Sequence, residues 1–333
     1  MTLHRASPLH PSSDLLIPQP APSYADALQN IAALQAEERR YLDPRCLSQL
    51  FTYGYKTQQA IVLVHGYTNS PCQFHQLGEQ LYQRGYNVFI PVLPYHGRLN
   101  RLTTEQSRLT AESLVRYMNQ AIDLARGLGH QITLAGLSGG GTAVAWAAQY
   151  RKDVDRAVLI APIFGFRPIP AWLTRFIDWL FLTLPDFYRW WDPVRKAGEG
   201  GINHAYPRYS THAMAQILRL GLAVRQAAYV QPPVAGSIAV VTNASDPIPN
   251  QCLIDDVVAH WRSWGVTVQT YEFAVELNLL HDLIDPDQPQ QHVDQVYPKL
   301  IQLITQPNGS PQFQIQMVAK DTNPVWSIKI KRC

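Results

Sequence analysis

The segment Gly136-Leu137-Ser138-Gly139-Gly140 carries the residues best suited to covalent chemistry. It matches the pattern G-x-S-x-G, in which a serine stands on a sharp turn between a strand and a helix. Such a turn exposes the serine hydroxyl, and the glycines let the strand and the helix approach closely. A buried-strand pattern precedes the segment and a run of small residues follows it. This context favours a nucleophile at Ser138 over the alternative, a glycine-rich helix N-terminus that only binds an anion.

A serine nucleophile needs a base and an acid, and candidates for both follow it in the order acid, then histidine. Asp246 comes just after a strand pattern at residues 237–241, and His281 comes after another at residues 267–273. Open α/β sheets place their sites in the loops at the carboxyl ends of the strands. We therefore predict Ser138 as nucleophile, His281 as base and Asp246 as the acid that orients the histidine.

Other polar residues compete for these roles. Asp282 and Asp285 lie too close in sequence to His281 to reach the far nitrogen of its ring easily, so we interpret them as helix caps. His65 and His96 follow other strand patterns. We expect His65 to brace the loop that stabilises the developing negative charge, and His96 to line a wall of the pocket.

Two backbone N–H groups are needed to stabilise the oxyanion of an acyl-transfer reaction, and each contributes roughly 3–4 kcal/mol. The residue after the nucleophile, Gly139, is the first predicted donor. The loop after the strand pattern at residues 60–64 reads His65-Gly66-Tyr67-Thr68-Asn69. The backbone N–H of Tyr67 is the second predicted donor, and Gly66 permits the turn.

Strand patterns alternate with helix patterns along most of the chain. The strand patterns lie at residues 50–55, 60–64, 87–90, 131–135, 157–160, 237–241 and 267–273. The helix patterns lie at residues 24–41, 110–128, from about 140, 210–229 and 291–304. Runs that are apolar on every residue are typical of strands covered on both faces. The order predicts an α/β fold with a doubly wound, mostly parallel sheet.

About 75 residues between two of these strand patterns break the alternation, too many for a structureless loop. We predict an α/β core at 50–162 and 235–305 and a helical cap inserted at 163–234. A partly helical extension precedes the core at 1–49, and an appendage follows it at 306–333. Alternating apolar residues in this appendage allow two strands. In the cap, Trp172, Phe176 and Trp179 fall at i, i+4 and i+7, on one face of a helix. We predict that this face binds substrate as an apolar channel facing Ser138; the alternative is that it forms the core of the cap.

The composition excludes several classes of function. Hydrophobic residues make up 46% of the chain, and the net charge of +3 comes from scattered Lys and Arg, without the basic stripe that nucleic acid binding requires. Near the start of the chain only residues 15–17 form an apolar run, too short for a signal peptide or a membrane span, so we expect a cytoplasmic protein. The cysteines have no zinc spacing, and we interpret them as free thiols, with disulfides as the alternative. They are Cys46, Cys72, Cys252 and Cys333.

Several of these motifs together resemble a known family. They are HGYTNSP at 65–71, LPYHG at 93–97, GLSGGG at 136–141, SDPIP at 245–249 and HD at 281–282. Over residues 50–305 the chain resembles the carboxylesterase, monoacylglycerol lipase and serine aminopeptidase-like branch of the α/β-hydrolase superfamily. The resemblance implies an eight-stranded sheet, a cap inserted after the sixth strand, an acyl-enzyme route, and no cofactor or metal. Tyr95 and Gly139 depart from residues frequent in relatives, and we expect both to alter the pocket wall.

These features together predict a serine hydrolase that cleaves small esters with apolar acyl or alcohol groups. The aromatic cap favours such substrates over sugars or charged peptides. Acyl transfer and amidase or peptidase action remain alternatives, because the same residues serve them. A non-catalytic binding module is a further alternative, and an intact set of Ser138, Asp246 and His281 argues against it.

Overall fold

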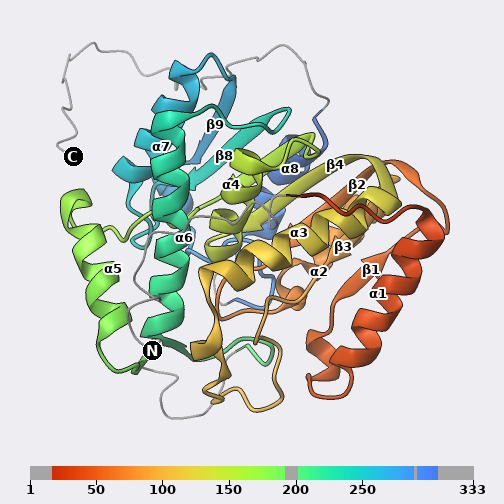
Figure 1. Cartoon of the computed structure of the whole chain (residues 1–333), viewed down its shortest axis with the longest axis horizontal. Helices are drawn as coiled ribbons and strands as arrows, with labels where there is room; N and C mark the ends of the chain where they lie inside the picture. Colours follow the sequence, from red (N-terminus) through yellow and green to blue (C-terminus); the bar gives the residue numbers. More distant parts are fainter. Residues whose placement is uncertain (1–16, 192–201, 289–290, 307–333) are drawn as a thin grey trace.

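A seven-stranded sheet forms the centre of the fold (Figure 1). The computed structural model describes residues 17–191, 202–288 and 291–306. The strands are β1 (Gln49–Phe51), β2 (Thr57–Val64), β3 (Asn87–Ile90), β4 (Gly129–Leu137), β5 (Arg156–Ile160), β8 (Ile238–Asn243) and β9 (Val268–Phe273). Their order is β1-β3-β2-β4-β5-β8-β9, and all neighbours pair in parallel except β1 with β3. The predicted mostly parallel sheet is confirmed, although the described residues contain seven of the eight strands that the resemblance implies.

The central strands are buried on both faces. Along β2, Ala60, Val62 and Val64 contribute to one hydrophobic cluster, whereas Ile61 and Leu63 contribute to the other. Because successive side chains of a strand point to opposite faces, a sheet covered on both sides needs apolar residues at every position. This is why the central strand segments are uninterrupted apolar runs.

Helices cover both faces of the sheet. In the larger cluster lie side chains of α1 (Tyr24–Glu38), α3 (Ala111–Leu128), α4 (Gly139–Tyr150), α6 (Thr211–Val230) and α7 (Gln251–Ser263). In the smaller cluster lie side chains of α2 (His75–Tyr82) and α8 (Val293–Thr305). In Figure 1, α3 and α6 lie in front of the sheet and α8 lies behind it. The carboxyl ends of the parallel strands are thereby left for the loops that carry the predicted site.

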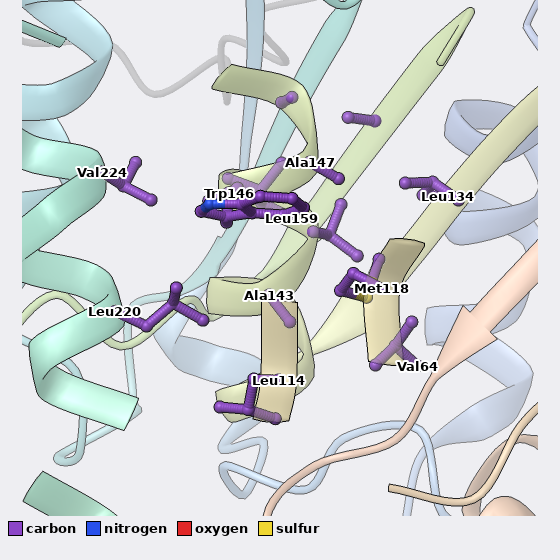
Figure 2. Packing of buried hydrophobic residues seen from close by; sticks show 14 of the residues in the cluster. Val64, Leu114, Met118, Leu134, Ala143, Trp146, Ala147, Leu159, Leu220 and Val224 are labelled. Carbon is purple, nitrogen blue, oxygen red and sulfur yellow. The ribbon is translucent and has the colours of Figure 1, made fainter. Parts of the chain in front are cut away.

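The helix that follows the predicted nucleophile is anchored deep in the larger cluster. Trp146 of α4 is fully buried. Figure 2 shows it flanked by Leu220 and Val224 of α6 on one side and by Leu159 and Leu134 of the sheet on the other. Fully burying large side chains contributes roughly 1.5–3 kcal/mol each. The start of α4, where the nucleophile stands, is therefore fixed by the packing of the whole helix.

The insertion between β5 and β8 is only partly helical. It contains α5 (Thr174–Thr183) and α6, as the helix patterns indicate. It also contains a two-stranded antiparallel ribbon, β6 (Tyr188–Trp190) with β7 (Arg208–Ser210), that the sequence analysis did not predict. In Figure 1, α5 lies beside α6 at the left edge of the molecule.

Three further expectations have different outcomes. Cys46 and Cys72 have free thiols as predicted, whereas Cys252 is disulfide-bonded, so the prediction of a free thiol is wrong for that residue. The strands expected in the appendage at 306–333 lie outside the described residues. None of the described helices is both long and apolar enough to cross a membrane.

Candidate active site

Ser138 stands on a sharp turn between β4 and α4. Its backbone has φ 57° and ψ −119°, a conformation that costs a residue with a side chain of the order of 1–3 kcal/mol. The close approach of strand and helix requires the glycines on either side: a methyl group on Gly140 would lie 2.3 Å from the Val64 carbonyl oxygen, and one on Gly136 would lie 2.5 Å from that of Gly140. The G-x-S-x-G segment thus forms the predicted strand–turn–helix element.

The structure brings Ser138, His281 and Asp246 together. His281 Nε2 lies 2.8 Å from Ser138 Oγ, and His281 Nδ1 lies 2.6 Å from Asp246 Oδ2. In the neutral tautomer that suits both contacts, the serine hydroxyl donates to Nε2 and Nδ1–H donates to the carboxylate. Asp246 is buried, and its other oxygen accepts the backbone N–H of Ile248, which fixes the direction of the carboxylate. The three residues therefore form a continuous chain of hydrogen bonds, in which His281 can take the proton of Ser138 while Asp246 stays ionised.

The surroundings of His281 favour its charged form. Burial acts most strongly and disfavours a charge on the ring, but the Asp246 carboxylate and its hydrogen bond, with a contribution from Asp282, outweigh burial. The net result is that the pKa of His281 is raised above its usual value of 6.5. An imidazole with a raised pKa accepts a proton more readily, which is the property required of a general base.

Tyr67 and Gly139, the two predicted oxyanion donors, lie side by side. A methyl group on Gly139 would lie 3.6 Å from the Tyr67 nitrogen. In the described part of the chain, no hydrogen bond to another backbone group occupies either N–H. His65 braces this loop as predicted: its Nδ1–H donates to the Gly66 carbonyl at 2.9 Å, and its Nε2 accepts the Leu93 N–H at 2.9 Å. Burial lowers the pKa of His65 well below its usual value, so the ring is neutral and keeps this tautomer.

Known proteins share this fold and these motifs. Residues 55–218 match the family model described as serine aminopeptidase, S33. The chain has the α/β-hydrolase fold. A thermostable monoacylglycerol lipase from Bacillus sp. (strain H-257) is 30% identical over 119 residues, which span 36% of this chain and 45% of the lipase, less than half its length.

Solved structures extend the similarity over most of the length of the chain. A structure from work on the metagenome-derived lipolytic enzymes LipS and LipT covers 79% of this chain and 98% of its own, with 18% identity and a TM-score of 0.59. A monoacylglycerol lipase from Paleococcus ferrophilus covers 77% of this chain and 97% of its own, with 16% identity and a TM-score of 0.57. At these identities the two structures establish the fold.

A buried polar network joins the loop of Gly66 and Tyr67 to the loop that carries His281. The side chain of Gln73 bridges them: the Gly66 N–H donates to Gln73 Oε1 at 2.7 Å, and Gln73 Nε2 donates to Asp282 Oδ1 at 2.6 Å. Asp282 Oδ2 accepts from Asn69 Nδ2 at 3.0 Å and from Gln288 Nε2 at 2.7 Å. Asp282 is therefore no helix cap, and that interpretation is wrong. Its carboxylate holds the two loops together through these hydrogen bonds.

The environment of Asp282 raises its pKa to about 6. Burial is the main cause and the neighbouring Asp285 carboxylate adds to it, while the amide donors and His281 act in the opposite direction. Asp285 is also buried, and it accepts from Asn69 Nδ2 at 3.2 Å and from the Asp287 N–H at 3.1 Å. It stabilises a turn rather than a helix end, so the interpretation as a helix cap is wrong for Asp285 as well.

A cavity of about 780 Å³ opens over Ser138 and His281. Apart from the loops already described, its wall is mostly apolar and comes largely from the insertion. The lining side chains from the insertion include Ile163, Phe166, Pro168, Ile169, Phe181, Trp191, Tyr209, Met214 and Ile217. Gly139, one of the two residues expected to alter the pocket wall, lines this cavity. The volume is that of a site for a small organic molecule.

The structure does not bring the predicted cap face to this cavity. Trp172, Phe176 and Trp179 are 81%, 52% and 50% exposed, and none of them lines the wall. The prediction of an apolar channel built from these three side chains is wrong for this arrangement, because α5 turns that face outward. From the same helix, Phe181 lines the cavity instead.

Tyr95 and His96 lie away from the catalytic cavity, so the expectation that they shape its wall is wrong. Both line a second cavity of about 500 Å³ between α1, α3 and residues 91–98. Tyr95 adopts φ 66°, in the left-handed region that favours glycine, so this turn is strained. Burial lowers the pKa of His96 to about 4, so that ring is neutral.

One cluster among the described residues has the composition of a metal site. Single ligand atoms of His204, Asp285 and Asp287 lie within 4.8 Å of one another. The two ring nitrogens of His204 already face the carboxylates, Nε2 at 3.0 Å from Asp285 Oδ2 and Nδ1 at 3.6 Å from Asp287 Oδ2. These contacts tie His204 of the insertion to the loop that carries His281.

Proposed function

We propose that the protein is a serine hydrolase that cleaves carboxylic esters through an acyl-enzyme intermediate. The observation that carries the proposal is the pair of contacts of His281, 2.8 Å to Ser138 Oγ and 2.6 Å to Asp246 Oδ2. It is supported by the raised pKa of His281 and by two unoccupied backbone N–H groups beside the serine.

The first half of the reaction acylates the serine. Ser138 Oγ attacks the ester carbonyl carbon as His281 Nε2 takes the hydroxyl proton, and Asp246 stabilises the imidazolium that forms. The carbonyl oxygen gains a negative charge and accepts hydrogen bonds from the N–H groups of Tyr67 and Gly139. The intermediate then collapses, the alkoxide leaves with the proton from His281, and the acyl group stays on the serine.

The second half releases the acid. Water takes the place of the alcohol, gives a proton to His281 and attacks the acyl carbon, which passes through a second tetrahedral intermediate in the same oxyanion site. Ser138 leaves with the proton that His281 holds. The overall change is ester plus water to acid plus alcohol, and each protein group ends as it began.

Apolar acyl or alcohol groups fit the cavity best, because its wall is mostly apolar. Each buried methylene contributes roughly 0.8 kcal/mol, close to a fourfold gain per methylene in kcat/KM while the chain still fits. Phe181→Ala should reduce the preference for medium-chain over acetate esters of p-nitrophenol. Trp179→Ala is the matched control, since Trp179 lies on the same helix outside the cavity. Equal loss in both variants would contradict the assignment of the wall.

Aminopeptidase action is a second candidate because the matching family model carries that description. An aminopeptidase must compensate the charge of a free α-amino group next to the scissile bond. Of the described residues that line the cavity, Asp282 alone carries a carboxylate, and both of its oxygens already accept hydrogen bonds from Gln73, Asn69 and Gln288. Ester cleavage is therefore the better supported function.

Labelling and turnover test the proposal together. A fluorophosphonate should label Ser138 alone, and Ser138→Ala should abolish the labelling and lower ester turnover by several orders of magnitude, because the three residues act as a unit. The assay compares p-nitrophenyl esters of increasing chain length with aminoacyl anilides. Labelling that persists in the alanine variant would place the nucleophile elsewhere, and faster cleavage of anilides than of esters would favour the peptidase.

A further inference from the structure

Arg189 places a positive charge on the wall of the catalytic cavity. It lies on β6, is exposed, and lines the cavity together with Trp191 and Tyr209. In the ribbon, Arg189 is directly opposite Tyr209, and residues two apart along a strand share a face. The three side chains therefore belong to one face of the ribbon, and that face forms part of the cavity wall.

The other face of the ribbon is occupied by contacts with the core. The Tyr188 hydroxyl donates to the Thr104 carbonyl at 2.7 Å, and the Arg208 guanidinium lies 4.6 Å from the centre of the Tyr188 ring. The Ser210 N–H donates to the Tyr67 hydroxyl at 3.1 Å. Because this last contact ties the ribbon to the loop of Tyr67, the backbone at Arg189 is held close to the predicted oxyanion donors.

The guanidinium of Arg189 is available for a ligand. It forms no hydrogen bond or ion pair with any other residue that the structure describes. Aside from His281, it is the one cationic side chain among the described residues of the cavity wall. The one carboxylate among the described residues of that wall is Asp282, in the loop of His281, and its two oxygens already accept hydrogen bonds from Gln73, Asn69 and Gln288. An anionic group in the cavity is thus attracted by Arg189, and an ionised Asp282 repels it.

From this polarity we propose that Arg189 forms an anion-binding subsite, and that the esters cleaved carry a carboxylate or phosphate group at a distance from the ester bond. The inference rests on the proposed ester hydrolase function and specifies its substrate class. Arginine suits either anion because its planar guanidinium donates two parallel hydrogen bonds. The apolar side chains of the same cavity wall then accommodate the chain that separates the ester from the charge.

A matched series of esters tests the subsite. p-Nitrophenyl esters whose acyl chains end in a carboxylate are compared with methyl-terminated esters of the same length, at low and high salt. A second comparison, of 1-acylglycerol 3-phosphate with 1-acylglycerol, tests whether the subsite binds a phosphate in the alcohol part of the ester. We expect the anionic member of the best-matched pair to have the higher kcat/KM, by about three- to tenfold, mainly through KM, since a partly exposed ion pair contributes modestly. High salt should reduce the preference.

Variants assign the preference to the residue. Arg189→Gln should bring the ratio of the two kcat/KM values to about one, Arg189→Lys should retain part of it, and Arg189→Glu should reverse it. Arg175→Gln is the control, because Arg175 is an exposed arginine of the inserted segment that does not line the cavity. In this variant the ratio should stay as in the wild type. Fluorophosphonate titration of Ser138 corrects each variant for its active fraction.

Two results would overturn the inference in distinguishable ways. Wild-type turnover of esters with no preference for any anionic member, or a preference that survives Arg189→Glu, would remove the subsite and leave the ester hydrolase intact. Absence of both ester turnover and Ser138 labelling would overturn the proposed function, and the subsite would fall with it.

Discussion

The Gln73 bridge allows a sharp test of how the oxyanion loop is held against the loop of the base. In Gln73→Glu the shape of the side chain is kept and the acceptor for the Gly66 N–H remains, but the donor to Asp282 Oδ1 at 2.6 Å is lost. A hydrogen bond to a charged group contributes about 1.5–3 kcal/mol, and two facing carboxylates add repulsion. The destabilisation should therefore exceed about 2 kcal/mol when both groups are ionised.

The loss should depend on pH with a defined sign. At low pH a proton shared between Glu at position 73 and Asp282 restores the bridge, so the folded state holds a proton that the unfolded state releases near pH 4. Stability of the variant relative to the wild type should then fall as pH rises. Thermal melts should show a small deficit at about pH 5 and a deficit of roughly 5 °C or more at about pH 8.

Turnover should fall when the loop that contains Gly66 and Tyr67 shifts. Gly66 precedes Tyr67, so a shift of this segment moves a proposed oxyanion donor, and small misplacements cost up to about a hundredfold in rate. We expect kcat of Gln73→Glu to fall at least about tenfold at pH 8 with a smaller change in KM. Gln76→Glu makes the same charge change three residues away, and it should alter neither value appreciably. Equal deficits at both pH values, or none, would refute the bridging role.

Three further outcomes are expected. Asp246→Asn should lower turnover by a factor of the order of 10⁴, because the histidine then takes the wrong tautomer; a loss within about tenfold would move the acid elsewhere. Since His281 must be neutral to act and its pKa is raised, the acidic limb of kcat/KM should have its midpoint above 6.5, whereas a flat profile to about pH 5 would exclude a histidine base. Burial raises the pKa of Asp178 to about 7, and the opposing effect of Arg219 is weaker. The contribution of Asp178 to stability therefore declines as pH rises from about 4 to 7. Asp178→Asn should therefore raise the melting temperature by several degrees at about pH 8 and little at about pH 4.

The sheet was predictable because each buried strand is an apolar run at the right distance from the next helix. Residues 87–90 coincide with β3, and residues 131–135 lie inside β4, which extends by two residues at each end. The pairing of β6 with β7 could not be read from the sequence. These are three-residue strands separated by 17 residues, and neither has an alternating pattern of its own. Their pairing depends on contacts with the core rather than on local preference.

The arrangement of the three candidate catalytic residues was also predictable from the sequence. Ser138, Asp246 and His281 each follow a strand, so their approach at one edge of the sheet is a consequence of strand order. The role of Gln73 had no such signal, because its partner Asp282 lies 209 residues away and a glutamine has no characteristic spacing. Asp282 was misinterpreted for the same reason: proximity to His281 suggested a local cap, whereas its partners come from a distant loop.

The cap shows where periodicity stops being informative. The spacing of Trp172, Phe176 and Trp179 indicates a shared face, but it does not indicate what covers that face. In α5 the buried positions are Thr174, Asp178 and Leu182, which also repeat every four residues, and the aromatic residues lie outside. The buried face carries the carboxyl group of Asp178, whose Oδ1 has no hydrogen-bond partner among the described residues. Ionising that group destabilises the packing of the helix, so the attachment of α5 depends on a buried acid that hydrophobic periodicity would place at the surface.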